Sequence, residues 1–213
     1  NSAKVIFDIH EVFHGAHLDR WLMGQRLSLI RNYVRLRIKR ICSKCDLVIG
    51  VSDAVLAPYI SDDTNSMVVR SCAPAWFAWG EPADICGSQR SSFNVIHGKG
   101  DLGRGTLKVV EAASIVNRQV NDLRIVMFKS FVNDNDYNIL LSRIEELKLS
   151  DVIVLRPGVA MQEMPDILRS CDVGLLAYGR NLGIDSLPNR LFEYMAAGLA
   201  IIAPIYAREI AKI

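Results

Sequence analysis

Residues 98–105 form the segment of the chain best suited to binding an anion. Their sequence, GKGDLGRG, contains four glycines together with Lys99 and Arg104. Glycine lets backbone N–H groups approach a ligand closely, and the segment falls between a predicted strand and a predicted helix N-terminus, where anions are stabilised. Two cations beside a helix N-terminus suit a diphosphate better than a single carboxylate. We therefore predict a diphosphate site in this glycine-rich segment.

The sequence of this segment also bears on two other kinds of nucleotide-binding loop. It is not a Walker loop, because no Gly-Lys-Ser or Gly-Lys-Thr sequence follows. Residues 98–103 match the pattern G-x-G-x-x-G formally, which would suit a nicotinamide cofactor. The acidic ribose ligand of such sites is replaced by Phe128, Lys129 and Ser130 at the end of the next predicted strand. A plain tight connection between strand and helix stays open as an alternative.

A second stretch, residues 185–204, carries two carboxylates near another predicted helix N-terminus. The helix is predicted over residues 189–197, directly after Pro188. Glu193 falls in its middle, on a segment otherwise fit for burial, and a buried carboxylate needs partners. Glu193 is either a solvated helix position or it converges with Asp185 at the helix N-terminus, where the helix dipole also favours a phosphate.

The same stretch is expected to pack against a core. Leu191, Met195 and Ala196 lie at helical spacing on the predicted helix. Residues 199–203 form a short apolar run that is closed by Pro204, which predicts a buried strand.

These two stretches belong to a regular alternation of strands and helices. The predicted strands cover residues 93–97, 123–128, 152–155, 173–178 and 199–203, and the predicted helices cover residues 106–118, 135–148, 161–170 and 189–197. Strict alternation with short connections indicates a parallel, doubly wound sheet. The carboxyl ends of parallel strands share one edge. We therefore expect the glycine-rich segment, residues 156–158, residues 178–185 and the start of the last helix to line one crevice.

The first half of the chain is also predicted to be α/β. Strands are predicted over residues 4–9, 46–52 and 67–70, and a long helix over residues 18–43, while Ser52 or Asp53 can cap a short helix that ends near Tyr59. Residues 73–92 contain prolines and small residues without an apolar period, which predicts a linker between two domains.

Three histidines, His10, His14 and His17, follow the first predicted strand. Open α/β sheets bind ligands at this end of a strand, so a metal site was considered. The i, i+4, i+7 spacing of the histidines requires a helix, which Gly15 interrupts. No metal is therefore predicted.

The composition describes a globular chain without a membrane span. Of its 213 residues, 50% are hydrophobic and 23% charged, and no apolar run approaches the roughly 18 residues needed to cross a bilayer. Five cysteines at irregular spacing argue against a secreted disulfide scaffold and favour a cytoplasmic setting. Cys42 and Cys45 have the C-x-x-C form, for which structural thiols are favoured over a redox or metal role.

Positive charge is concentrated in one segment, although the net charge is only +2. Residues 20–44 contain eight Lys or Arg residues and no acidic one. Either this is an ordinary solvated helix face, or it lies against an anionic membrane surface or an acidic acceptor.

These motifs resemble the retaining glycosyltransferases of GT-B fold, glycosyltransferase family 4 (group 1). Members carry a loop G-R-x-x-x-x-K-G after the first strand of the donor domain, and residues 98–105 keep both cations in exchanged positions. They also carry two glutamates separated by seven residues before a strand A-x-G-x-P-V-I. Here Asp185 and Glu193 precede the sequence AAGLAII, and aspartate stands where the family has its first glutamate.

Three further segments support the resemblance. Residues 186–194, SLPNRLFEY, resemble a subgroup that takes part in the biosynthesis of bacterial surface polysaccharides. Residues 8–11 resemble the D-x-H-E loop of the family's acceptor domain, and residues 46–52 resemble its D-x-V-I-x-V-S strand. One departure is the sequence of residues 128–130, which replaces the usual glycine-rich turn.

The resemblance implies a GT-B architecture of two Rossmann-like, doubly wound parallel-sheet domains. Residues 1–72 would be the last part of an incomplete acceptor domain, residues 73–92 the linker, and residues 93–213 the domain that binds the nucleotide sugar. Several strands of the family's acceptor domain and its closing helices have no counterpart here. We therefore expect a fragment of a longer protein, which can be inactive by itself.

The resemblance also implies roles for particular residues. The implied residues are Gly98, Lys99, Arg104, Gly158, Val159, Asn189 and Glu193 for donor binding, and His10 and Asp185 for catalysis. Lys99 and Arg104 would bind the diphosphate, Glu193 the ribose, and the backbone near Gly158 the base. Asp185 would contact the donor sugar, and His10 would lie near the acceptor.

The implied reaction is sugar transfer from a nucleotide-diphosphate sugar to a saccharide or lipid-linked acceptor with retention of configuration. The leaving phosphate would take the acceptor's proton, so the reaction would need neither a dedicated base nor a cofactor or metal. A peripheral location on the inner face of the membrane fits this activity, and no nucleic acid is expected as a partner. The alternatives are a GT-B-fold epimerase of nucleotide sugars and a non-catalytic domain that binds them.

Overall fold

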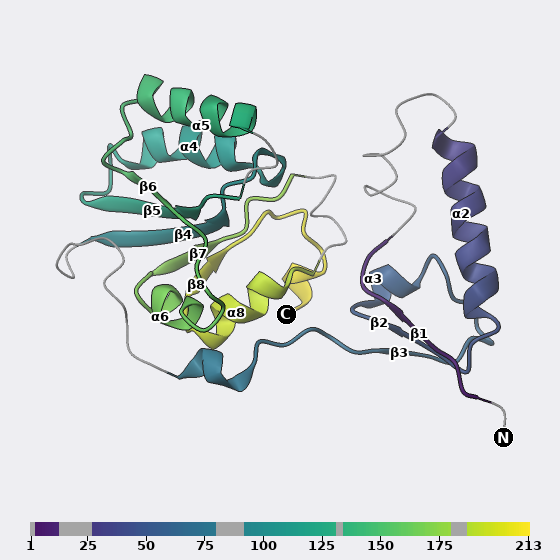
Figure 1. The fold of residues 1–213 in the computed structure, drawn as a ribbon. Coiled ribbons are helices and arrows are strands. Elements are labelled where there is room, and N and C mark those ends of the chain that lie inside the picture. The colour runs from purple at the N-terminus through teal and green to yellow at the C-terminus, as the bar shows by residue number, and fades with distance from the viewer. Residues whose placement is uncertain (1–2, 13–26, 80–91, 131–133, 180–186) are drawn as a thin grey trace. The chain divides into compact units, whose positions relative to one another are not determined.

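The computed structural model describes residues 3–12, 27–79, 92–130, 134–179 and 187–213 (Figure 1). The chain divides into two compact units. The first comprises Asn1–Ser71, Asn181–Leu187 and Ala207–Ile213, and the second comprises Cys72–Arg180 and Pro188–Tyr206. Part of the predicted linker, residues 80–91, lies outside the described residues, so the predicted domain boundaries stay a prediction.

The second unit contains a five-stranded sheet in the order β6-β5-β4-β7-β8, and all its strand pairs are parallel. The strands are β4 (Phe93–Lys99), β5 (Leu123–Phe128), β6 (Ile153–Arg156), β7 (Val173–Leu175) and β8 (Ala200–Ile202). The strand order reverses between β4 and β7. Ligands of doubly wound sheets bind beyond the carboxyl ends of the strands at such a reversal.

Helices cover both faces of this sheet, as the alternating sequence predicted. The helices α4 (Thr106–Val116) and α5 (Asp134–Glu146) lie on one face, and α6 (Met164–Arg169) and α8 (Asn189–Ala196) on the other (Figure 1). Two short 3-10 helices, η2 (Ala75–Ala78) and η3 (Leu102–Arg104), belong to the same unit. The prediction of a doubly wound α/β fold is confirmed for this unit.

The core of the second unit follows from the apolar runs of its strands. Met127 and Val126 on β5 are fully buried, as expected for a strand with helices on both sides. Met127 packs with Val110 of α4 and Leu140 of α5, which are also fully buried. This packing fixes where α4 begins, and with it the segment that precedes α4.

The first unit contains a three-stranded parallel sheet in the order β1-β2-β3. Its elements are β1 (Ile6–Ile9), α2 (Leu27–Cys42), β2 (Leu47–Gly50), α3 (Asp53–Leu56), β3 (Ser66–Val68) and the 3-10 helix η4 (Ile210–Lys212). Ser52 caps α3, since its side chain accepts a hydrogen bond from Val55 N at 3.3 Å. No helix in the described ranges is long and apolar enough to cross a membrane.

Two sequence predictions about the last helix and strand were wrong. Tyr194 is fully buried, whereas Met195, predicted to face the core, is 46% exposed. The Tyr194 ring lies against Gly174 on β7, where a Cβ would stand 2.2 Å from the ring, so position 194 faces the sheet. Strand β8 was predicted to be buried, but Ala200 and Ile202 are exposed, because β8 lies at the end of the described sheet.

Candidate functional site

The glycine-rich segment begins inside strand β4, which runs two residues further than predicted. A register shift against β5 between Ile96 and Gly98 bends the strand. Gly98 has φ +79°, a conformation that side chains disfavour. A Cβ on Gly98 would also stand 1.4 Å from Nη1 of Arg190, so the arginine occupies the space that a side chain would fill.

The segment then forms a tight turn built around Asp101. Its carboxylate accepts a hydrogen bond from Gly103 N at 2.9 Å, and its carbonyl accepts one from Arg104 N at 3.0 Å. Gly105 ends the turn with φ +79°, and a Cβ there would lie 2.0 Å from the carbonyl oxygen of Ala177, which follows β7. The turn therefore rests against the chain after β7, at the reversal of strand order.

The two predicted cations of this turn differ in their surroundings. Lys99 is exposed at the end of β4, and no hydrogen bond or ion pair joins its ammonium group to another residue in the described part of the chain. Arg104 is held by Tyr178: its Nη1 donates to the hydroxyl at 3.4 Å, and its Cζ lies 5.6 Å from the ring centroid. Arg104 also lies 3.6 Å from the carboxylate of Asp101.

Arg190, a third cation, was missed by the sequence analysis. It lies in the first turn of α8, and its Nη1 donates to the carbonyl of His97 at 3.4 Å. Its place directly after Asn189, in a helix N-terminus already predicted to bind a phosphate, was the available sequence signal. The structure thus brings Arg190 next to Gly98, a predicted ligand contact.

Helix α8 is anchored on β4 by Tyr194, whose hydroxyl donates to the carbonyl of Ile96 at 3.3 Å. Burial raises the pKa of the Tyr194 hydroxyl far above its usual value, so it stays a donor. Glu193 is half-buried on the same helix, and no hydrogen bond or ion pair joins its carboxylate to any other described residue. Asn189 is exposed at the helix start. The Glu193 carboxylate is therefore available to a ligand.

The buried residue of the site is His97, which precedes Gly98. Its Nε2 lies 3.1 Å from Oγ1 of Thr106. Burial, and then the charges of Arg190 and Arg104, lower the pKa of His97 to about 4, while the backbone of Leu175 acts in the opposite direction. His97 is therefore neutral at pH 7.

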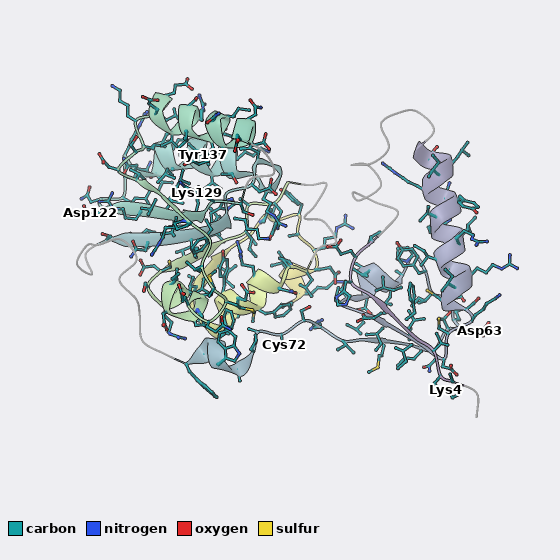
Figure 2. All side chains as sticks on the ribbon, viewed as in Figure 1. Lys4, Asp63, Cys72, Asp122, Lys129 and Tyr137 are labelled. Carbon is teal, nitrogen blue, oxygen red and sulfur yellow. The ribbon has the colours of Figure 1, made fainter. Side chains whose placement is uncertain are left out.

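The remaining predicted donor residues lie at the same edge of the sheet. Lys99 is in register with Phe128, and Phe128 with Arg156, so the ends of three neighbouring strands align. Gly158 and Val159 follow two residues later, Gly158 exposed and Val159 half-buried. Lys129, also at this edge, lies with its Nζ 5.0 Å from the ring centroid of Tyr137 on α5 (Figure 2).

The predicted catalytic residues are not brought together by the described structure. His10 belongs to the first unit, where it follows β1, is exposed and lies 3.0 Å from the carboxylate of Asp8. Asp185, like His14 and His17, lies outside the described residues. Within the described ranges, no three His, Cys, Asp or Glu side chains gather as metal ligands.

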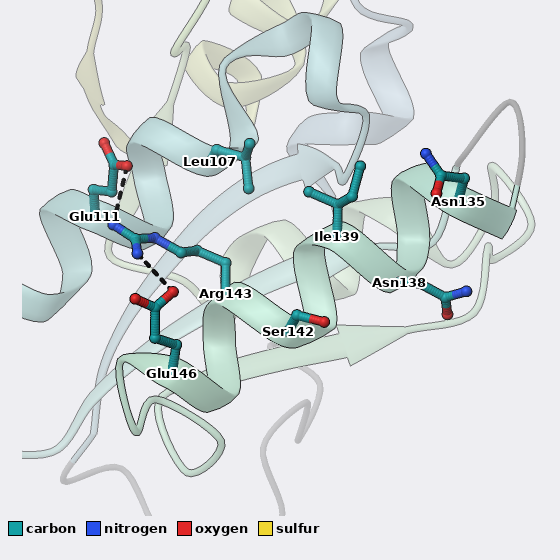
Figure 3. Close-up of a pocket in the computed structure, with 8 residues that line it drawn as sticks. All are labelled: Leu107, Glu111, Asn135, Asn138, Ile139, Ser142, Arg143 and Glu146. Carbon is teal, nitrogen blue, oxygen red and sulfur yellow. Dashed lines mark hydrogen bonds and ion pairs between the residues drawn. The ribbon is translucent and has the colours of Figure 1, made fainter.

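A pocket of about 480 Å³ lies elsewhere, between α4 and α5 (Figure 3). No predicted site residue lines it. Its arginine, Arg143, lies 3.3 Å from Glu111 and 2.7 Å from Glu146, so its charges are largely compensated. This surface groove has none of the uncompensated cations that a diphosphate needs.

The C-x-x-C pair lies at the end of α2 and just beyond it. Cys42 is buried and Cys45 half-buried, and both are free thiols. Burial raises the pKa of Cys42, which disfavours the nucleophilic thiolate, and the Cys45 thiol donates to the carbonyl of Ile41 at 3.3 Å. The structural interpretation of these thiols is favoured by this geometry.

No protein-family model matches the chain, and no curated protein matches it by sequence. Solved structures do match. HepE of Anabaena, in complex with UDP and glucose, superposes with a TM-score of 0.72 at 13% identity, over 99% of this chain and 55% of HepE. Sucrose-phosphate synthase from Thermosynechococcus elongatus gives 0.64 at 16% identity, over 93% and 49%. A glycosyltransferase from Rickettsia africae gives 0.63 at 18% identity, over 81% and 48%.

At these identities the likeness establishes the fold. The similar structures are glycosyltransferases of GT-B fold, and the two parallel sheets flanked by helices of this chain have the same α/β architecture. The predicted fold class is therefore confirmed. The chain spans about half the length of HepE, 55% and 56% in two of its complexes.

Proposed function

We propose that this chain carries the donor-binding part of a glycosyltransferase that uses a nucleotide-diphosphate sugar. The observation that carries the proposal is the convergence of Gly98, Lys99, Arg104 and Arg190 at the reversal of strand order in the second unit. It is supported by the fold, and by similar structures whose complexes contain UDP or UDP-glucose.

The electrostatics at this point suit a diphosphate. Arg190 lies against Gly98 and the His97 carbonyl, and Arg104 lies within the turn itself, so two positive charges flank the turn. Neither α4 nor α8 has a side-chain cap at its N-terminus, so backbone N–H groups there are available to phosphate oxygens. The nearby Asp101 carboxylate is already engaged by Gly103 N and Arg104.

The remaining contacts complete the proposed donor site. Glu193 would accept hydrogen bonds from the ribose hydroxyls, since its carboxylate has no partner in the described structure. The backbone at Gly158 and Val159 would meet the base, and Asn189 would contact the donor at the start of α8. Asp185 would contact the donor sugar, and His10 the acceptor.

The proposed reaction is transfer with retention, as in glycosyltransferase family 4. The acceptor oxygen forms a bond to the anomeric carbon on the face that the diphosphate leaves, and the acceptor's proton passes to a leaving phosphate oxygen. Lys99, Arg104 and Arg190 stabilise the charge that develops on that phosphate. Three cations take the role that a metal ion would have, so no metal or cofactor is proposed.

The first unit suggests the acceptor. Helix α2 exposes Leu29, Tyr33, Leu36 and Ile41 among its arginines, and it has no acidic residue. Arg37, Arg40, Ile41 and Lys44 surround a hollow of about 320 Å³. We propose that this surface lies against anionic lipid, which brings the enzyme to a lipid-linked saccharide acceptor of surface-polysaccharide biosynthesis.

Calorimetric titration tests the donor site. UDP and GDP are titrated into the wild type and into the double variant Lys99→Ala/Arg104→Ala. Loss of two charge-assisted contacts is expected to weaken binding about a hundred-fold. Arg118→Ala, which removes an exposed cation beyond the end of α4, is the control and should bind like the wild type. Equal affinity in the double variant would exclude this diphosphate site.

Liposome flotation tests the proposed membrane surface. The wild type is expected to float with vesicles that contain anionic lipid, and to lose this association as salt screens the charges. Arg37→Ala/Arg40→Ala should float less, and the Lys99→Ala/Arg104→Ala variant should float like the wild type. No preference for anionic over neutral vesicles would reject this partner.

Two other functions make different predictions for the complete enzyme. An epimerase would form product from the donor alone, whereas a transferase consumes donor in proportion to glycosylated acceptor. A non-catalytic domain would bind UDP or GDP without turnover. A donor-hydrolysis and transfer assay separates the three.

A further inference from the structure

His97 lies beneath the turn that the proposed donor site uses, and no role has been given to it so far. It is 4% exposed, and its Nδ1 is buried and makes no hydrogen bond of acceptable geometry among the described residues, although the backbone of Leu175, which acts to raise the pKa of His97, lies beside the ring. Thr106, its partner through Nε2, is fully buried at the start of α4. Because buried polar groups are normally hydrogen-bonded, the positions of the protons on His97 and Thr106 determine how this pair is held.

The geometry determines the position of each proton. Thr106 Oγ1 lies 2.6 Å from the carbonyl oxygen of Asp101, and only the threonine hydroxyl can donate between these two oxygens. The hydroxyl proton is thereby used, so Thr106 must accept from His97. The imidazole consequently carries its proton on Nε2, and Nδ1 is the bare nitrogen.

The hydrogen bonds from His97 to Thr106 and from Thr106 onward end at Asp101, around which the turn is built. The carbonyl of Asp101 accepts from Thr106 and also from Arg104 N, and the Asp101 carboxylate binds Gly103 N and lies near Arg104. Rotation of the Asp101 peptide would break the first two bonds together. The backbone of Arg104, whose side chain reaches Tyr178, is therefore tied to His97 through three hydrogen bonds, by way of the Asp101 carbonyl and Thr106.

We propose that His97 is a positioning residue that, with its proton on Nε2, holds the turn of residues 98–105 through Thr106 and so sets the affinity for the donor diphosphate. The affinity part rests on the proposed function. The positioning part concerns the turn alone. His97 itself does not reach the ligand, because it is buried below Gly98.

The first test needs neither a ligand nor a substitution. A long-range ¹H–¹⁵N NMR spectrum at pH 7, with His97 assigned by its contact to the Thr106 methyl group, should show the proton on Nε2. A proton on Nδ1 would overturn the proposal. Nε2 would then accept the hydrogen bond of the Thr106 hydroxyl, which could no longer donate to the Asp101 carbonyl.

The second test uses variants of Thr106. Thr106→Val removes the hydroxyl at nearly constant size, and Thr106→Ser keeps it. The valine variant should shift the amide resonances of residues 98–105, and the serine variant should restore them. Thr64→Val, which removes a hydroxyl that binds Ser61 in the first unit, is the control and should leave them unchanged. Unshifted amides in folded Thr106→Val would contradict the positioning role.

UDP calorimetry then separates this inference from the proposed function. The Thr106→Val variant should bind UDP about ten-fold more weakly than the wild type, and Thr106→Ser within about two-fold of it. Wild-type affinity in Thr106→Val would overturn the effect on donor affinity. If the wild type binds neither UDP nor GDP while the NMR results are as expected, the proposed function fails and the positioning role stands.

Discussion

At the scale of single residues, the candidate site depends on where charge is left uncompensated. Lys99, Arg104 and Glu193 could be predicted from the sequence, because a charged side chain beside a predicted strand end or helix start indicates a ligand. Arg190 also lies at a predicted helix start, but the sequence does not show that it reaches the turn of residues 98–105. Its contact with the His97 carbonyl arises only because α8 crosses the end of β4, and the pattern of the chain does not contain that crossing.

The lowered pKa of His97 predicts how the stability of the folded protein depends on pH. The groups around it are Arg190 on α8, Arg104 on η3, Thr106 on α4 and the backbone of Leu175 on β7. Its folded-state pKa of about 4 lies below the ordinary value of 6.5, so between these values the unfolded chain binds more protons than the folded one. The free energy of unfolding should therefore fall as pH drops from about 6.5 to 4, by up to about 3 kcal/mol.

Urea unfolding of the wild type and His97→Gln across this pH range measures the effect. The variant is expected to be less stable at pH 7, and its stability should depend less on pH. Parallel curves for the two proteins would show that another group causes the acid sensitivity.

At the scale of elements, the sequence predicted which helices and strands exist, and their order along the chain, better than it predicted their buried faces and their end residues. The limits of β5 are as predicted, residues 123–128, because an apolar run that only Arg124 interrupts is bounded by Asp122 and Lys129. Strand β4 extends through Lys99, because the bend at Gly98 lets pairing with β5 continue, which a glycine in the sequence does not reveal. The faces of α8 were mispredicted because the close approach of Tyr194 to Gly174 is a tertiary contact.

Gly105, which connects η3 to α4, provides a testable prediction about these two elements. Gly105→Ala would place a Cβ against the carbonyl of Ala177 in a left-handed conformation, and backbone cannot yield as a side chain can. We expect a loss of at least about 2 kcal/mol of stability and weaker UDP binding.

Gly103→Ala is the matched control in the same turn. Gly103 is exposed, and a Cβ there would meet only the Asp101 carboxylate oxygen, at 3.3 Å. Its stability should stay within about 0.5 kcal/mol of the wild type in the same urea experiment. Equal losses in both variants would mean that the turn tolerates no added side chain anywhere.

At the scale of the whole molecule, the α/β class and the parallel sheets could be predicted from the alternation of strands and helices. The strand order could not, since short parallel strands of similar composition can be arranged in several ways. The order β6-β5-β4-β7-β8 matters most for function, because the reversal between β4 and β7 selects one strand end among five.

Hydrogen exchange measured by mass spectrometry, with and without UDP, tests that selection across the described chain. Protection is expected in residues 98–107 and 188–193, where the ligand would cover backbone N–H groups, and little change is expected in α5. Protection of α5 instead would indicate that the groove of about 480 Å³ between α4 and α5 is the ligand site.

Gly98 and Arg190 occupy one shared volume, since a Cβ on the first would stand 1.4 Å from Nη1 of the second. Positions 98 and 190 are therefore expected to change together during evolution. A side chain gained at position 98 must displace the guanidinium of Arg190 or be accompanied by a shorter residue there, and either change removes a cation from the turn. Paired substitution at these two positions, ninety-two apart along the chain, would be the evolutionary trace of this contact.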